Sequence, residues 1–203
     1  MDVKTAIEDR RSIRKYKAAP VSDELVKELL EAARLAPSGT NHQPWRFIVV
    51  RDPAVKKKIQ EAAFNQQYLS AAPVLLVCCA DIMTYAADTK TRVEELVAAG
   101  AMEPEALVTY PGLNKPKDLE AVKGMIPHAM LNVAIAMENI ALRAVSLGLG
   151  TCFVQLMKAK KIAEILNLPE NIIITALMPV GFPDQSPAAR PRIPLEKIIY
   201  QVI

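Results

Sequence analysis

Residues 37–45 are Pro-Ser-Gly-Thr-Asn-His-Gln-Pro-Trp, and the apolar segment Trp45 to Val50 follows directly. Proline, glycine and asparagine favour turns, whereas aromatic and β-branched residues favour strands. Earlier in the chain, residues 10–14 are Arg-Arg-Ser-Ile-Arg. One guanidinium group can donate two hydrogen bonds to the oxygens of a phosphate, and the serine hydroxyl adds a further donor. We therefore expect an amide-rich turn before a strand, and a candidate anion site near the start of the chain.

Each motif alone has an ordinary structural explanation, a solvated basic surface for the first and a simple turn for the second. Their order and spacing, with a helix between them, resemble the FMN-dependent nitroreductase family. Later segments also match the family, namely Gly148 to Cys152, Met178 to Gly181 and Arg190 to Arg192. The resemblance therefore covers nearly the whole chain.

The resemblance implies an α+β fold, in which helices surround a mixed central sheet and a C-terminal strand reaches the partner subunit of a homodimer. The alternation of strands and helices also suits a doubly wound α/β sheet, but the resemblance favours the first architecture. Without repeats or linkers, we expect one nitroreductase-like domain over residues 1–203. Residues 83–123, which prolines interrupt, are a candidate lid or insert.

Several elements can be expected from local patterns. Ser22 is a favourable N-cap, and apolar residues recur at helical spacing up to Pro37. The uninterrupted apolar run 73–80 is typical of a central strand buried on both faces. Residues 127–147 predict a long buried helix, in the core of the subunit or of a dimer. Further helices are expected over residues 2–9, 52–64, 85–99 and 159–166, and further strands over residues 45–50, 149–156, 172–180 and 198–203.

The composition argues against several classes of function. The net charge of +3 is mild for a chain of 203 residues, which does not suggest a nucleic-acid partner. The three cysteines lack metal-ligand spacing, so we expect no metal site and a reducing compartment. The first residues contain no signal-peptide core, and Glu138 and Arg143 argue against a membrane span within the long helix. The expected location is the cytoplasm.

In the family, an N-terminal Arg-x-Ser-x-Arg/Lys motif and a late basic pair hold the phosphate and ribityl chain of FMN. The corresponding residues here are Arg10, Arg11, Ser12, Arg14, Arg190 and Arg192. Asn65 and Gln67 are candidates for the flavin ring, because an amide presents a donor and an acceptor together. Gln66, between them, is interpreted as a polar helix end. The main chain near Gln155 and Leu156 corresponds to the family segment that approaches flavin N5, and the role of the Gln155 side chain stays open because many relatives have Glu-Gly there.

The turn also carries candidates. Pro37, Ser38, Gly39 and Asn41 match family residues that reach the flavin bound mainly by the other subunit. Gln43 is expected to brace this loop, and Trp45 to anchor the strand in the core. Within the insert, the candidates for binding the substrate are Tyr85, Tyr110 and Lys115.

The resemblance thus implies an FMN-dependent oxidoreductase. A hydride would pass from NAD(P)H through flavin N5 to a nitroaromatic, quinone or related small electrophile by a ping-pong mechanism. Because the cofactor would carry the redox chemistry, no side chain is expected to be catalytic. Two alternatives stay open: the same fold with reductive dehalogenation, enone reduction or flavin breakdown, and a non-catalytic flavin-binding module. A Rossmann site is not expected, since Gly148-Leu149-Gly150 lacks the third glycine and precedes a strand.

Overall fold

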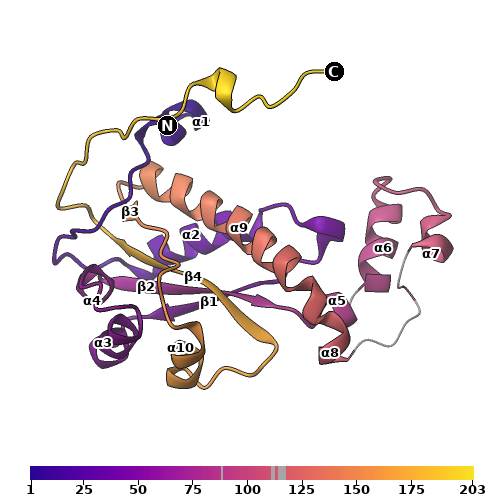
Figure 1. Cartoon of the computed structure of the whole chain (residues 1–203), viewed down its shortest axis with the longest axis horizontal. Coiled ribbons are helices and arrows are strands. Elements are labelled where there is room, and N and C mark those ends of the chain that lie inside the picture. Colours follow the sequence, from indigo (N-terminus) through magenta and orange to yellow (C-terminus); the bar gives the residue numbers. More distant parts are fainter. Residues whose placement is uncertain (88, 111–112, 114–117) are drawn as a thin grey trace.

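The computed structural model describes residues 1–203 except 88, 111–112 and 114–117, and it shows a sheet with helices on both faces (Figure 1). The strands are β1 (Trp45–Val50), β2 (Val74–Asp81), β3 (Gly150–Thr151) and β4 (Ile172–Gly181). The helices are α1 (Val3–Asp9), α2 (Asp23–Arg34), η1 (Gly39–Asn41), α3 (Pro53–Ala62), α4 (Tyr68–Ala71), α5 (Thr84–Ala87), α6 (Thr89–Ala98), α7 (Ala106–Thr109), α8 (Leu119–Val122), η2 (Lys123–Met125), α9 (Ile126–Ser146), α10 (Ala159–Ile165) and η3 (Leu195–Lys197).

The sheet has the strand order β1-β2-β4-β3, and its strands pair antiparallel. An isolated bridge between Ser12 and Thr151 adds a parallel contact at the β3 edge. The expected central strand is confirmed, because β2 lies between β1 and β4 and is buried along almost its whole length. The α+β fold is therefore confirmed, although the four strands form an antiparallel sheet and, among the described residues, only the Ser12–Thr151 bridge is parallel.

Alternate residues of β2 belong to two different hydrophobic cores. Leu76 and Cys78 pack on the side of α2 and α9, whereas Leu75 and Val77 pack on the side of α3 and α10. This division follows from the strand geometry, in which successive side chains point to opposite faces. A continuous apolar sequence is needed here because both faces are covered.

The long apolar helix is confirmed as α9, which crosses one face of the sheet beside α2 (Figure 1). Its buried residues, including Ala136, Met137 and Ile140, belong to the core shared with α2 and the sheet. Among the described residues, the helical stretch Leu119–Ser146 is long and apolar enough to cross a membrane. Packing against the sheet accounts for the apolar face of α9 within the subunit.

The expected helix starts are confirmed by their caps. The side chains of Asp2, Ser22 and Asp52 accept hydrogen bonds from the main-chain N–H groups of the first turns of α1, α2 and α3. Two expected elements are shorter than predicted. Residues 85–99 contain the end of α5 and the separate helix α6, and residues 149–156 contain only β3 and a bridge from Val154.

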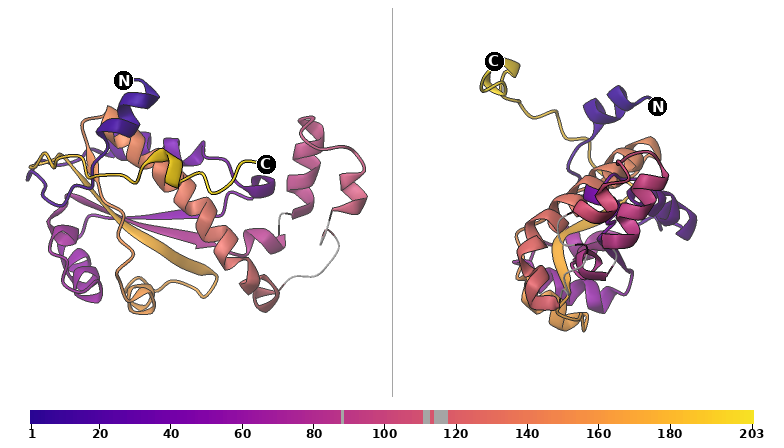
Figure 2. Two further views of the ribbon diagram at one scale, coloured as in Figure 1. Left: turned by 45° about the horizontal axis from the view of Figure 1, so that its top comes forward. Right: turned by 90° about the vertical axis from the view of Figure 1, so that its right-hand side faces the viewer.

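The strand predicted over residues 198–203 is wrong for the single chain. This tail follows η3 without regular structure and extends away from the sheet (Figure 2), and Tyr200 is 99% exposed. A strand needs a neighbouring edge for its N–H and C=O groups, and the tail has no such edge beside it. Exchange of this tail with a partner subunit stays a prediction.

Candidate functional site

A cavity of about 630 Å³ lies between the N-terminal segment and the C-terminal tail. The six residues predicted to contact phosphate all line this cavity, although they come from opposite ends of the sequence: Arg10, Arg11, Ser12, Arg14, Arg190 and Arg192. We call it the arginine cavity. Of the described residues in its lining, only Glu8 carries a negative charge.

The N-terminal side of the arginine cavity is fixed on β3 and β4. Ile13 N donates a hydrogen bond of 2.8 Å to Thr151 O of β3, and the Tyr16 hydroxyl donates to Ile13 O at 2.6 Å and to Pro179 O of β4 at 3.3 Å. Gly150 permits this close approach, because a Cβ at this position would lie 2.5 Å from Ile13 Cγ1. The sheet thus holds the chain at Ile13 and Tyr16, on both sides of Arg14.

The charges of the arginine cavity fit a phosphate group. Within the described part of the chain, none of its five arginines forms an ion pair with a carboxylate. The Arg11 guanidinium donates to the carbonyl oxygens of Glu8 and Arg10, but Arg11 Nε is buried without a partner among the described residues. An anion that accepts charge-assisted hydrogen bonds would stabilise such a set of cations.

Beside this cavity, the turn between α3 and α4 contacts the segment after β3. Phe64 and Asn65 have left-handed φ angles of 56° and 55°, which reverse the chain after α3. Gln66 Nε2 then donates to Leu156 O at 2.9 Å. Asn65, Gln67, Gln155 and Leu156 are exposed at this junction, so the four residues predicted to face the flavin ring lie on two segments that touch.

The structure adds two residues that were not predicted for the site. Gln66 connects the two segments, and the Tyr68 ring lies under Arg14, whose Cζ is 5.9 Å from the ring centroid. Burial raises the pKa of Tyr68, and the nearby Arg14 opposes that change. Tyr68 therefore stays a protonated donor near neutral pH. Local sequence could not identify Gln66, because a glutamine after a helix is an ordinary polar residue.

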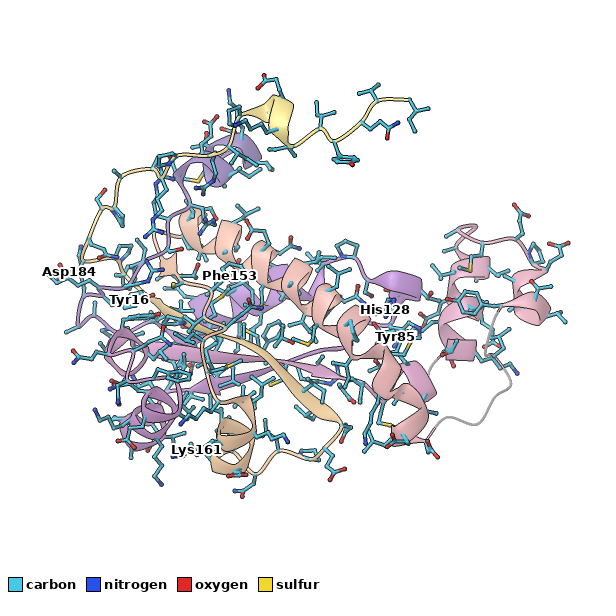
Figure 3. All side chains as sticks on the ribbon, in the orientation of Figure 1. Tyr16, Tyr85, His128, Phe153, Lys161 and Asp184 are labelled. Carbon is cyan, nitrogen blue, oxygen red and sulfur yellow. The ribbon has the colours of Figure 1, made fainter. Side chains whose placement is uncertain are left out.

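A second cavity, of about 380 Å³, lies near the other end of α9, and we call it the tyrosine cavity. It is lined by Gly39, Thr40, His42, Tyr85, Tyr110, Met125, His128, Leu131 and Asn132. Figure 3 shows Tyr85 and His128 together, well separated from Tyr16 beside the N-terminal segment. The structure thus brings the turn and two predicted substrate residues together, but it does not bring them to the arginine cavity. The third, Lys115, lies outside the described residues.

Strained backbone and side-chain bonds shape the turn beside the tyrosine cavity. Thr40, Asn41 and Gln43 have left-handed φ angles of 49°, 52° and 49°, which are costly for residues with a Cβ. Gln43 Nε2 donates to Asn41 Oδ1 at 3.0 Å, and Gln43 N donates to Ser38 Oγ at 3.0 Å. The prediction that Gln43 braces the loop is confirmed. Trp45 is 8% exposed and belongs to the core, as expected.

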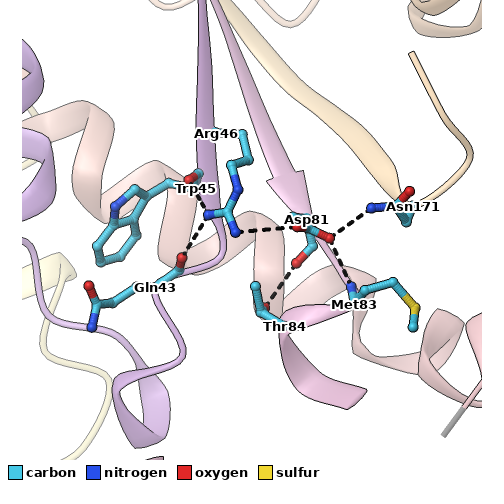
Figure 4. Close-up of polar contacts among 7 residues, drawn as sticks. All are labelled: Gln43, Trp45, Arg46, Asp81, Met83, Thr84 and Asn171. Carbon is cyan, nitrogen blue, oxygen red and sulfur yellow. Dashed lines mark hydrogen bonds and ion pairs between the residues drawn. The ribbon is translucent and has the colours of Figure 1, made fainter. Parts of the chain in front are cut away.

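Asp81 connects this turn to the next helix (Figure 4). Its carboxylate accepts hydrogen bonds from Arg46, from Asn171 and from Met83 N, and Arg46 also donates to Gln43 O. The end of β2 is thus bonded to the turn, to the residue before β4 and to the start of α5. Since α5 carries Tyr85, these bonds fix two walls of the tyrosine cavity relative to each other.

The fold and the first cavity define an α+β protein with an arginine-rich cavity whose charge suits an anion. Comparison with known proteins identifies the family: the model of the Nitroreductase family matches residues 7–182. A protein from Thermus thermophilus named NADH dehydrogenase is 34% identical over 199 residues, which cover 98% of this chain and 95% of that protein. The chain therefore belongs to the nitroreductase family and is an oxidoreductase.

Solved structures show the same fold. A nitroreductase-like protein from Streptococcus mutans has a TM-score of 0.83 and 23% identity, with 98% of this chain and 97% of that chain covered. The NADPH:FMN oxidoreductase from Vibrio harveyi, complexed with NAD⁺, has a TM-score of 0.76 and 25% identity. That comparison covers 98% of this chain and 76% of the Vibrio chain.

Proposed function

We propose that this protein is an FMN-dependent NAD(P)H oxidoreductase that reduces nitroaromatic, quinone or related small electrophilic acceptors. The observation that carries the proposal is the arginine cavity, which gathers five arginines from both ends of the chain without carboxylate partners among the described residues. The relatives support the choice of ligand, since one is named an NADPH:FMN oxidoreductase. Bound FMN would supply hydride-transfer chemistry between NAD(P)H and the acceptor, and the two substrates would then react in turn.

The residues of the chain bind and orient the cofactor. Arg10, Ser12 and Arg14 would hold the phosphate from the N-terminal side, and Arg190 and Arg192 from the C-terminal tail. The amides of Asn65 and Gln67 would bind the polar edge of the ring. The main chain at Gln155 and Leu156 would face the reactive part of the ring, with Arg11 supporting the phosphate side.

We further propose that the acceptor binds in the tyrosine cavity of the partner subunit of a homodimer. The loop residues Pro37, Ser38, Gly39 and Asn41 would complete the partner's flavin site, with Tyr85 and Tyr110 on the wall that faces the acceptor. This arrangement is supported by the separation of the two cavities along α9, where Asn132 lines the tyrosine cavity and Val145 lines a smaller pocket that shares Arg10 and Arg11 with the arginine cavity. The lid role of residues 83–123 and the cytoplasmic location belong to the same proposal.

An absorbance spectrum of the freshly purified protein tests the cofactor. Flavin absorbance that is bleached anaerobically by NADH or NADPH would support the proposal. Reoxidation of the reduced protein by a panel of nitroaromatics, quinones, enones and halogenated aromatics would then rank the acceptors. A colourless protein that cannot be reconstituted with FMN would refute it, and bound flavin that neither donor reduces would indicate a binding module.

Two substitutions test the phosphate residues. Arg14→Ala and Arg192→Ala should each remove a charge-assisted contact of roughly 1.5–3 kcal/mol. Each should weaken FMN binding by about tenfold or more. Lys17→Ala, which removes an exposed cation from the same segment, is the matched control. Unchanged FMN affinity in both arginine variants would mean that the phosphate lies elsewhere.

A mixed dimer tests whether two subunits share a site. Arg14→Ala damages the arginine cavity, and Tyr85→Ala damages the wall of the tyrosine cavity. If each flavin site combines the two cavities from different subunits, a dimer of one Arg14→Ala chain with one Tyr85→Ala chain contains one intact site and recovers activity. If both cavities of one chain serve one site, mixing the variants recovers nothing.

A further inference from the structure

Gln66 uses every part of its side-chain amide. Its Nε2 donates to Ala63 O at 2.8 Å and to Leu156 O at 2.9 Å, and its Oε1 accepts from the Tyr68 hydroxyl at 2.5 Å. The opposite orientation of the amide would place an oxygen against two carbonyl oxygens, so these three partners fix the orientation. A side chain bonded in this way joins three segments of the chain.

The same bonds connect Arg14, which lines the arginine cavity, to the main chain at Leu156. The Tyr68 hydroxyl donates to Gln66, and the Tyr68 ring lies under Arg14, whose Cζ is 5.9 Å from the ring centroid. Gln66 in turn binds the carbonyl of Leu156. The contacts therefore run without a gap from a phosphate-binding candidate to the main chain that follows β3.

Two main-chain hydrogen bonds hold the ends of the same segment. Lys158 N donates to Ala62 O at 2.9 Å, and Val154 N donates to Leu177 O at 3.0 Å. Between these two main-chain anchors, Gln155 and Leu156 are exposed, and Leu156 is 61% exposed. In the segment between those anchors, the bond from Gln66 is thus the side-chain bond that restricts the Leu156–Met157 peptide.

We propose that Gln66 is a positioning residue for the flavin ring, because its side chain holds the main chain at residues 155–157 in place. The proposal rests on the proposed FMN site. It predicts that loss of Gln66 changes the properties of the bound ring as well as the mobility of this segment, whereas loss of a phosphate contact changes only affinity.

Three variants separate the bonds. Gln66→Leu removes all three, Gln66→Glu keeps the acceptor for Tyr68 but places a carboxylate against two carbonyl oxygens, and Tyr68→Phe removes one bond while the ring under Arg14 stays. Lys58→Ala, an exposed substitution on α3, is the control. Tyr68→Phe also keeps the test valid if either Gln66 variant fails to fold.

Hydrogen exchange of the cofactor-free protein is the first measurement. Exchange at the amides of residues 155–158 should become faster by about 2- to 12-fold for each hydrogen bond lost. Gln66→Leu and Gln66→Glu should show the larger effect, Tyr68→Phe the smaller, and Lys58→Ala none. Unchanged exchange in both Gln66 variants would overturn the proposal, whether or not the protein binds flavin.

The midpoint potential and visible spectrum of bound FMN are the second measurement. The potential and the spectrum should change in Gln66→Leu and should stay closer to those of the wild type in Tyr68→Phe. Arg14→Ala should weaken FMN binding with little change in the potential or the spectrum. A Gln66→Leu protein with wild-type potential and spectrum would overturn the positioning role. If the wild type binds no FMN at all, the proposed function fails, and the exchange experiment still decides whether Gln66 holds the segment.

Discussion

The substitution Gly150→Ala tests how the fold builds the arginine cavity. An added Cβ would lie 2.5 Å from Ile13 Cγ1 and 2.8 Å from Ile13 Cβ. Carbon atoms pack best at about 3.5–4.0 Å, so the segments must separate by roughly 1 Å. Ile13 cannot turn aside easily, because it is buried, β-branched and bonded through its main chain to Thr151 at 2.8 Å. Overpacking of this kind costs about 1–3 kcal/mol.

Two measurements follow from this magnitude. For a domain of this size, a loss of about 1–3 kcal/mol corresponds to a fall in Tm of roughly 2–12 °C. Displacement of the segment also moves Ser12 and Arg14, so FMN binding should weaken in parallel. Thermal unfolding of the cofactor-free protein gives the change in Tm, and quenching of flavin fluorescence gives the FMN affinity. Gly124→Ala is the matched control, since an added Cβ there meets nothing within 4 Å.

The contact with Ile13 can be isolated by a double mutant. Ile13→Ala alone should cost about 2–5 kcal/mol by opening a cavity. Combined with Gly150→Ala, the total should fall short of the sum by about 0.5–3 kcal/mol, because the new methyl group occupies part of that cavity. Strict additivity, or a Gly150→Ala protein as stable as Gly124→Ala, would refute the reasoning.

Three other substitutions test the core at Leu29, the Asp81 carboxylate and the buried Cys79 thiol. Leu29 of α2 is 0% exposed in the core shared with α9, so Leu29→Ala should lower the free energy of unfolding in urea by about 2–5 kcal/mol. Leu35 is 65% exposed, so Leu35→Ala should change this free energy by about 0.5 kcal/mol or less. Asp81→Ala should cost about 1–3 kcal/mol by leaving its three donors without an acceptor, and Asp81→Asn should recover part of this loss. Burial raises the pKa of Cys79 from 9.0 to about 12, so the unfolded thiol ionises first and the unfolded state binds fewer protons at high pH. Stability should therefore fall as pH rises from about 9 toward 12, and urea unfolding should show a smaller fall in Cys79→Ala; an equal fall would contradict the assignment to this thiol.

Elements governed by neighbours in the sequence were predictable. Ser22 and Asp52 mark the starts of α2 and α3 because a cap bonds to residues only three positions ahead. The double burial of β2 followed from a continuous apolar run. The capping residues and the apolar run therefore predicted individual helices and the central strand, whereas the α+β architecture was predicted from the family resemblance.

Features governed by distant partners were not predictable from local patterns. Residues 198–203 have the apolar composition of a strand, but their conformation depends on an edge that the single chain does not offer. Gln66 gains its importance from Leu156, far along the sequence. The gathering of Arg14 with Arg192 was predicted only through the family resemblance, since no local rule joins the two ends of a chain.

The positions of the two cavities along α9 support the proposal that two chains share each site. Asn132 lines the tyrosine cavity, and Val145 lines a smaller pocket that shares Arg10 and Arg11 with the arginine cavity. At a rise of 1.5 Å per residue, these two positions on one straight helix are roughly 20 Å apart. A hydride donor and acceptor must both contact the ring, so this separation favours a site in the proposed enzyme that combines the arginine cavity of one chain with the tyrosine cavity of its partner. In the proposed homodimer, the turn at Gly39 and the tyrosines beside it would reach the arginine cavity of the second copy of the chain.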